Sequence, residues 1–280
     1  MRKPIASDRF YPGDPEKLKK QLESFLPNYP NSNAKIAIVP HAGYIYGGNC
    51  MGETYSKLKK ECDTIIILGP NHANREPLVN ISFQNFLTPL GKTSIDLDLA
   101  NHILSQSKIF RLKTEENERA QESEHSIEIQ LPFIQTLFPE AKIIPILIGD
   151  LSFEESLKLS RIIYYTSRNK KIIVIISSDF SHYGEIYKFT PFVKNIKENL
   201  YNLDLRAINF ILDSESRSFY NYAKEYTTIC SISGIVIAIE LAKLFSCPKI
   251  EKTMFLSSAD FSNDYSNSVN YCGITFSPEL

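Results

Sequence analysis

Two histidines follow apolar, strand-like runs in matching contexts. His41 stands in "VPHAGYIYGG" (residues 39–48), directly after the run "KIAIV", and His72 ends "TIIILGPNH" (residues 64–72). Neutral imidazole is a common metal ligand, with its nitrogen about 2.0–2.1 Å from the ion. Alternatively, each histidine caps its strand or bonds a neighbouring carbonyl group. A single histidine favours the structural role, but the repeated pattern leaves the two interpretations open.

A third polar segment, "SSDFSHYG" (residues 177–184), follows the most hydrophobic strand candidate. It places Asp179 and His182 three residues apart. On a tight turn such a pair can act as an orienting group and a general acid or base. The alternative is an Asx-turn that leaves His182 exposed, and the residues favour neither reading.

The segment "EHSIEIQLPF" (residues 124–133) opens a predicted helix. Its serines and glutamates are typical of a capped helix start. The candidates for this capping are Ser123, Ser126, Glu124 and Glu128. Capping leaves His125 unexplained. At a helix N-terminus the dipole keeps an imidazole neutral, and a neutral histidine donates a hydrogen bond well.

Cys230 begins "CSISGIVIAIE", at the start of an apolar helix. That position lowers the pKa of a thiol and favours thiolate, the metal-binding form. From the residues alone, a packed core cysteine remains the favoured interpretation. The chain has five cysteines, widely spaced and without a CxxC pair, which argues against a disulfide framework or a zinc ribbon. His102, the fifth histidine, is predicted on a helix surface.

Composition narrows the class of protein. The chain has 280 residues, 43% hydrophobic and 22% charged, with a net charge of -1. These values suit a globular protein and offer no bulk electrostatic case for nucleic acid or an anionic membrane. The N-terminus lacks the apolar core of a signal peptide, and the longest apolar runs are too short or interrupted to span a bilayer. We therefore expect a cytoplasmic protein.

Strands and helices alternate along the chain, which predicts a layered α/β domain. Predicted strands cover residues 35–40, 63–69, 78–83, 142–149, 171–178, 251–259 and 268–276. Predicted helices cover residues 14–26, 96–106, 126–138, 152–168, 195–213 and 232–245. Continuous Ile/Val/Leu runs indicate central strands covered on both faces, and the last two strands suit a hairpin at one edge. Ligands in such folds bind where strands end, which is where the histidines fall.

The ordered motifs resemble the Memo family, found in bacteria, archaea and eukaryotes. They are "PHAGYIYGG", "ILGPNH", "TPLG", "EHSIEIQLPF", "IIPILIG", "SSDFSHYG" and "TTICSISGIVIAIELA". The resemblance covers essentially the whole chain, residues 1–280, as one domain. It implies the fold of class III extradiol dioxygenases, an α/β domain with a central mixed β-sheet flanked by helices on both faces.

The resemblance also implies a metal site. In the family two histidines and a cysteine are taken to hold the metal, and they match His41, His72 and Cys230. Fe(II) is the first expectation and Cu the second. Asp179 and His182 match the family's aspartate and acid/base histidine, and we add His125 to the expected catalytic set. The family commonly has glycine after the cysteine, whereas this chain has serine, which bears on the angle of the sulfur.

These features predict a metal-dependent oxidoreductase related to the dioxygenases. One alternative is a protein that binds a peptide or small molecule without catalysis, as suggested by the phosphotyrosine-containing partners linked to animal members of the family. Another is a metal or redox homeostasis protein without turnover. Neither nucleic acid nor a membrane is an expected partner, and the oligomeric state stays open.

Overall fold

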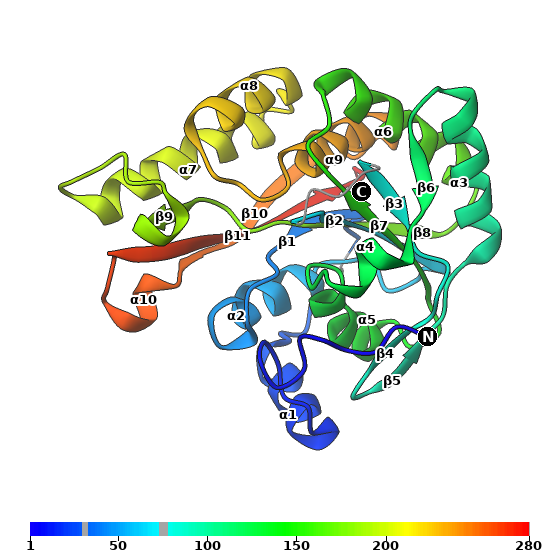
Figure 1. The fold of residues 1–280 in the computed structure, drawn as a ribbon, viewed down its shortest axis with the longest axis horizontal. Coiled ribbons are helices and arrows are strands. Elements are labelled where there is room, and N and C mark those ends of the chain that lie inside the picture. The colour runs from blue at the N-terminus through cyan, green and yellow to red at the C-terminus, as the bar shows by residue number, and fades with distance from the viewer. Residues whose placement is uncertain (30–32, 73–77, 280) are drawn as a thin grey trace.

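The computed structural model describes residues 1–29, 33–72 and 78–279 of the chain. A mixed β-sheet lies at its centre (Figure 1). Its strands are β1 (Ile36–Val39), β2 (Thr64–Pro70), β3 (Val79–Ile81), β6 (Thr114–Glu116), β7 (Lys142–Ile148), β8 (Ile172–Ser177), β9 (His182–Gly184), β10 (Lys249–Ser257) and β11 (Asn267–Ser277). They are ordered β10-β11-β1-β8-β2-β7-β3-β6, and β9 pairs with β11.

The four central strands β1, β8, β2 and β7 run parallel to one another. Their residues are buried almost throughout, as expected for Ile/Val-rich strands covered on both faces. Outside them, β11 and β3 run antiparallel to their central neighbours, so the sheet is mixed. The predicted hairpin is confirmed, because β10 pairs with β11 at one edge.

Helices cover both faces of the sheet (Figure 1). One face carries α1 (Pro15–Phe25), α2 (Tyr44–Tyr55) and α5 (Leu131–Leu137). The other carries α3 (Leu97–Ile109), α6 (Phe153–Ser167) and α9 (Ile232–Leu244), and this layer continues through α8 (Ser216–Tyr226) to α7 (Ile196–Leu212). The remaining elements are the β4 (Phe86–Thr88) and β5 (Gly91–Thr93) hairpin, α4 (Glu118–Glu122), η1 (Glu128–Gln130), η2 (Glu185–Tyr187) and α10 (Ala259–Ser262). The predicted layered α/β fold is confirmed.

The glycine-rich segment after His41 is not among the predicted helices. It forms helix α2, and its glycines allow close packing against α1. A side chain at Gly48 would collide with the Phe25 ring, and one at Gly52 would collide with the Phe25 carbonyl oxygen. These glycines therefore serve helix contact rather than a turn, which the short-range pattern could not reveal.

The expected helix over residues 126–138 also starts later than predicted. A 3₁₀ turn, η1, precedes α5, and the Ser126 hydroxyl lies 3.2 Å from the Pro70 carbonyl oxygen, to which it donates, instead of capping a helix. The capping interpretation of this segment is therefore wrong. Among the described residues, no helix combines the length and apolar character needed to cross a bilayer.

Candidate metal centre

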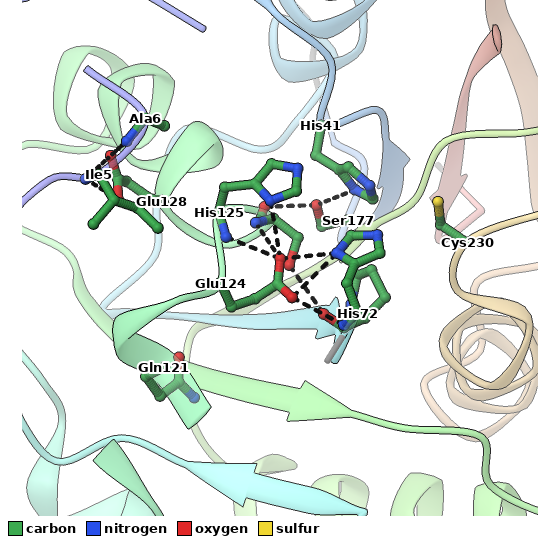
Figure 2. Close-up of polar contacts among 12 residues, drawn as sticks. Ile5, Ala6, His41, His72, Gln121, Glu124, His125, Glu128, Ser177 and Cys230 are labelled. Carbon is green, nitrogen blue, oxygen red and sulfur yellow. Dashed lines mark hydrogen bonds and ion pairs between the residues drawn. The ribbon is translucent and has the colours of Figure 1, made fainter. Parts of the chain in front are cut away.

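The parallel central strands place the predicted site residues at one end of the sheet, where the carboxyl ends of these strands lie. His41, His72 and Asp179 each lie two residues beyond the carboxyl end of β1, β2 or β8, respectively. Cys230 approaches from the other side, just before α9. Ligand atoms of His41, His72 and Cys230 lie within 4.8 Å of one another, and Figure 2 shows the three side chains around one space. The fold thus brings all three predicted ligands together.

His41 is almost fully buried, with 2% of its surface exposed. Its backbone N–H donates to Asp179 Oδ1 at 2.8 Å, and its ring Nδ1 lies 3.0 Å from the Ser177 hydroxyl. Burial, with His72 and His125 nearby, holds the pKa of His41 well below its usual value. The ring is therefore neutral at pH 7, and Nε2 is the atom left for a ligand role.

His72 is half-exposed and rests on the carboxylate of Glu124. Its Nδ1 lies 3.0 and 3.1 Å from the two carboxylate oxygens, and its backbone N–H also donates to this group. Burial opposes the charged imidazolium, but the hydrogen bond and the charge of Glu124 outweigh it and raise the pKa of His72. A carboxylate on one ring nitrogen orients the other toward a metal.

His125 lies beside the two ligand candidates. Its ring stacks on the His72 ring at 5.2 Å and packs against Phe10 at 4.9 Å. The pKa of His125 is lowered, as expected, but burial is the main cause and no helix begins there. His72, Glu124 and His125 also form a close group. The oxygens of Glu124 are, however, already occupied by backbone N–H groups and by His72, which favours an orienting role.

Asp179 and His182 line the Cys230 side of the space. Asp179 is 6% exposed, and burial raises the pKa of its carboxyl group. His182 is half-buried, and its Nδ1 lies 3.0 Å from the Phe180 carbonyl oxygen, which can only accept. In the neutral ring Nε2 then carries the lone pair, 3.9 Å from Cys230 Sγ. Because the Asp179 carboxylate bonds across to His41, the alternative of a local Asx-turn with an exposed His182 is wrong.

Cys230 lies outside the first turn of α9, which begins at Ile232 with Ser231 as its N-cap residue. Its N–H donates to the Asp179 carbonyl oxygen at 3.1 Å. Burial, followed by the charge of Asp179, raises the pKa of the Cys230 thiol well above its usual value. The expected lowering of this pKa is therefore wrong. The thiol must give up its proton to a metal when one binds.

His102 and the other cysteines lie away from the site, whereas Ser231 adjoins Cys230. His102 is exposed on α3, as predicted. All five cysteines are free, and Cys50, Cys247 and Cys272 are buried. Ser231, which follows Cys230, donates its N–H to the Ser178 hydroxyl, and within the described residues its own hydroxyl oxygen has no hydrogen-bond partner.

Sequence reasoning missed the residues that hold the loop before α5. Arg2 is buried, lies 2.7 Å from Glu128 Oε2, and donates to the carbonyl oxygens of Gln121 and Glu124. Glu128 accepts from the N–H groups of Ile5 and Ala6, and Figure 2 shows it facing that segment, away from the histidines. The N-terminal segment thus fastens the loop that carries Glu124. The separation in sequence leaves no local signal for these contacts.

Two strand-end histidines and a cysteine at one edge of a mixed sheet define the class: an α/β protein with a candidate metal centre. A family model described as "Memo-like protein" matches residues 2–275. Similar curated proteins include a MEMO1 family protein of Thermococcus kodakarensis, 33% identical over 99% of both chains. Another, from Desulfurococcus amylolyticus, is 35% identical over 98% of both chains. The chain belongs to the Memo-like family.

Proposed function

We propose that this protein binds Fe(II) or Cu through His41, His72 and Cys230 and acts as an oxidoreductase on a small molecule. One observation carries the proposal: two imidazole nitrogens and a thiol converge within 4.8 Å. Imidazole suits iron and copper, and a soft thiolate disfavours magnesium and calcium. The donor set therefore fits the metals that the family resemblance implies.

The surroundings of the ligands support the same reading. Ser177 and Glu124 each occupy Nδ1 of a histidine, which leaves Nε2 for the metal. A bound metal would supply a Lewis acid and redox centre with open coordination positions.

Two further residues have roles that do not require them to be ligands. His182 presents Nε2 to the space beside Cys230 and is placed to move a proton. Asp179 holds the backbone of both His41 and Cys230 and so orients them. A cavity of about 310 Å³ adjoins His72 and Cys230 and gives room for a small substrate.

Anaerobic metal titration of wild type and Cys230→Ser tests the proposal. We expect the substitution to weaken Fe(II) and Cu binding by at least about 100-fold, more than the loss of an orienting partner. Thermal melts should show little loss of stability, because serine is tolerated near a helix start. Cys62→Ser, a half-buried cysteine in another loop, is the matched control and should bind as wild type does.

Unchanged affinity in Cys230→Ser would show that the thiol is a packed core residue and would contradict the metal site. Oxygen uptake with a panel of phenolic substrates then tests turnover. Tight metal binding without any uptake would favour a binding or homeostasis role over an oxidoreductase.

A further inference from the structure

Ser177 is the last residue of β8. It lies between His41 and the loop that carries Glu124, the residue that supports His72. Ser177 is fully buried, and its hydroxyl oxygen has three polar neighbours. These are His41 Nδ1 at 3.0 Å, Gln130 Nε2 at 3.0 Å and the Ser126 carbonyl oxygen at 2.7 Å. A serine hydroxyl offers one donor and two acceptor lone pairs, so three partners complete its capacity.

The direction of each hydrogen bond follows from its partners. A carbonyl oxygen only accepts, and two oxygens at 2.7 Å without a shared hydrogen would repel each other. The Ser177 hydrogen therefore points to the Ser126 carbonyl group. Both lone pairs of Ser177 remain as acceptors.

The orientation of Gln130 is fixed in the same way. Its amide group lies 2.9 Å from the Pro40 carbonyl oxygen, which requires the NH₂ end there. Its oxygen then accepts from the Tyr55 hydroxyl, also at 2.9 Å. The Gln130 NH₂ group consequently donates to the Ser177 hydroxyl oxygen. One lone pair of that oxygen is left to accept a hydrogen bond from His41. Nδ1 of His41 must carry a hydrogen to use it.

We infer that Ser177 is a positioning residue that fixes His41 as the Nδ1–H tautomer, with the Nε2 lone pair available to a metal. The purpose of this arrangement rests on the proposed function, but the tautomer is a property of the metal-free protein. In the neutral His72 ring, Glu124 imposes the same tautomer by accepting from Nδ1. Because Ser177 also bonds to Ser126, it joins the His41 strand to the loop that supports His72.

NMR of metal-free protein with ¹⁵N-labelled histidine measures the tautomer directly. Signals of His41 are assigned as those missing from His41→Ala. We expect the Nδ1–H form in wild type and a loss of that preference in Ser177→Ala. Ser178→Ala is the matched control, because Ser178 is equally buried and adjacent but donates to the Asp179 carbonyl oxygen. It should leave the His41 tautomer unchanged.

Three results would overturn the inference. They are an Nε2–H form of His41 in wild type, an unchanged tautomer in Ser177→Ala, or an equal change in Ser178→Ala. The first needs no variant and stands even if Ser177→Ala fails to fold. In titrations with Fe(II), we expect Ser177→Ala to bind roughly 10–100-fold more weakly.

The two proposals fail separately. A wild-type protein with the Nδ1–H tautomer but no affinity for metal contradicts the proposed function and leaves the positioning role of Ser177 standing. A wild-type protein that binds metal with His41 in the Nε2–H form contradicts the role of Ser177 alone.

Discussion

Two buried carboxylates support the two sides of the candidate metal centre. Their surroundings shift their pKa values in opposite directions. Glu124 is 5% exposed and accepts from the His72 ring and from backbone N–H groups of His72, His125 and Ser126. Asp204, on α7, is 0% exposed and accepts from the hydroxyl and N–H of Ser181 and from the Asn270 amide. Both groups hold a loop in place.

The difference lies in the pKa values of the two carboxyl groups. Burial alone would raise the pKa of Glu124, but the hydrogen bond and charge of His72 and the backbone donors lower it to about 2. Burial raises the pKa of Asp204 to about 6, because its neutral donors compensate only in part. The comparison teaches that the donors around a buried acid decide the direction of its pKa shift. The acid with the lowered pKa sits beside a candidate ligand, and the acid with the raised pKa supports the turn before His182.

The largest expected effect is on the pH dependence of stability. Folding raises the pKa of Asp204 from its usual 3.8 to about 6, so the folded state holds this proton more tightly. The free energy of unfolding therefore falls as pH rises from about 4 to about 6, by up to about 3 kcal/mol from this group. Asp204→Asn should remove that slope and gain up to about 3 kcal/mol relative to wild type between pH 4 and pH 7.

Urea denaturation at several pH values measures the effect. Asp98→Asn, at an exposed aspartate of α3, is the control for the same substitution outside a buried environment. Parallel curves for wild type and Asp204→Asn would show that Asp204 is not the buried acid described here. Glu124 acts in the opposite sense: its stabilisation is present above about pH 4.5 and is lost as pH falls toward 2.

The next effect separates the two acids by metal affinity. Glu124→Gln removes the charge that orients His72 and places an NH₂ group near backbone donors, so metal binding should weaken roughly 10–100-fold. Asp204→Asn should bind metal as wild type does, because Asp204 contacts no candidate ligand. Competition titrations measure both, with Glu122→Gln on the exposed side of the same segment as control. Equal losses of metal affinity in the two variants would contradict the different roles assigned to Glu124 and Asp204.

The smallest effect on metal binding is expected from His182→Ala. His182 lies on the side supported by Asp204 and is outside the group of three candidate ligands. The variant should keep the metal stoichiometry of wild type, while any oxidative turnover falls by roughly 10²–10⁴-fold, as for a lost general acid or base. Metal content by elemental analysis checks the first point. Loss of the metal would make His182 a ligand.

Much of the fold follows from local patterns. The central strands are continuous Ile/Val runs, and the end of each parallel strand places its polar residue at the same edge. Helix α2 was missed because Gly48 and Gly52 resemble turn residues until the packing of Phe25 is known. The reason for these glycines is a contact in the folded protein, which the local sequence does not show.

The residues that support the candidate ligands could not be predicted either, because their contacts join segments that are far apart in sequence. Glu124 meets His72 across 52 residues of sequence, and Ser177 meets His41 across 136. Nothing in the local spacing distinguishes Glu124 from a helix-capping acid. The Cys230 thiol was misjudged because its burial, and the nearby Asp179 carboxylate, outweigh its position near a helix start.

X-ray absorption spectroscopy of Fe(II)- or Cu-loaded protein tests the central claim most directly, because it counts the sulfur atoms bound to the metal. We predict one sulfur at about 2.3 Å together with imidazole nitrogens in wild type, and no sulfur in Cys230→Ser. A metal shell of nitrogen and oxygen alone in the wild-type protein would contradict the assignment of Cys230 as a ligand.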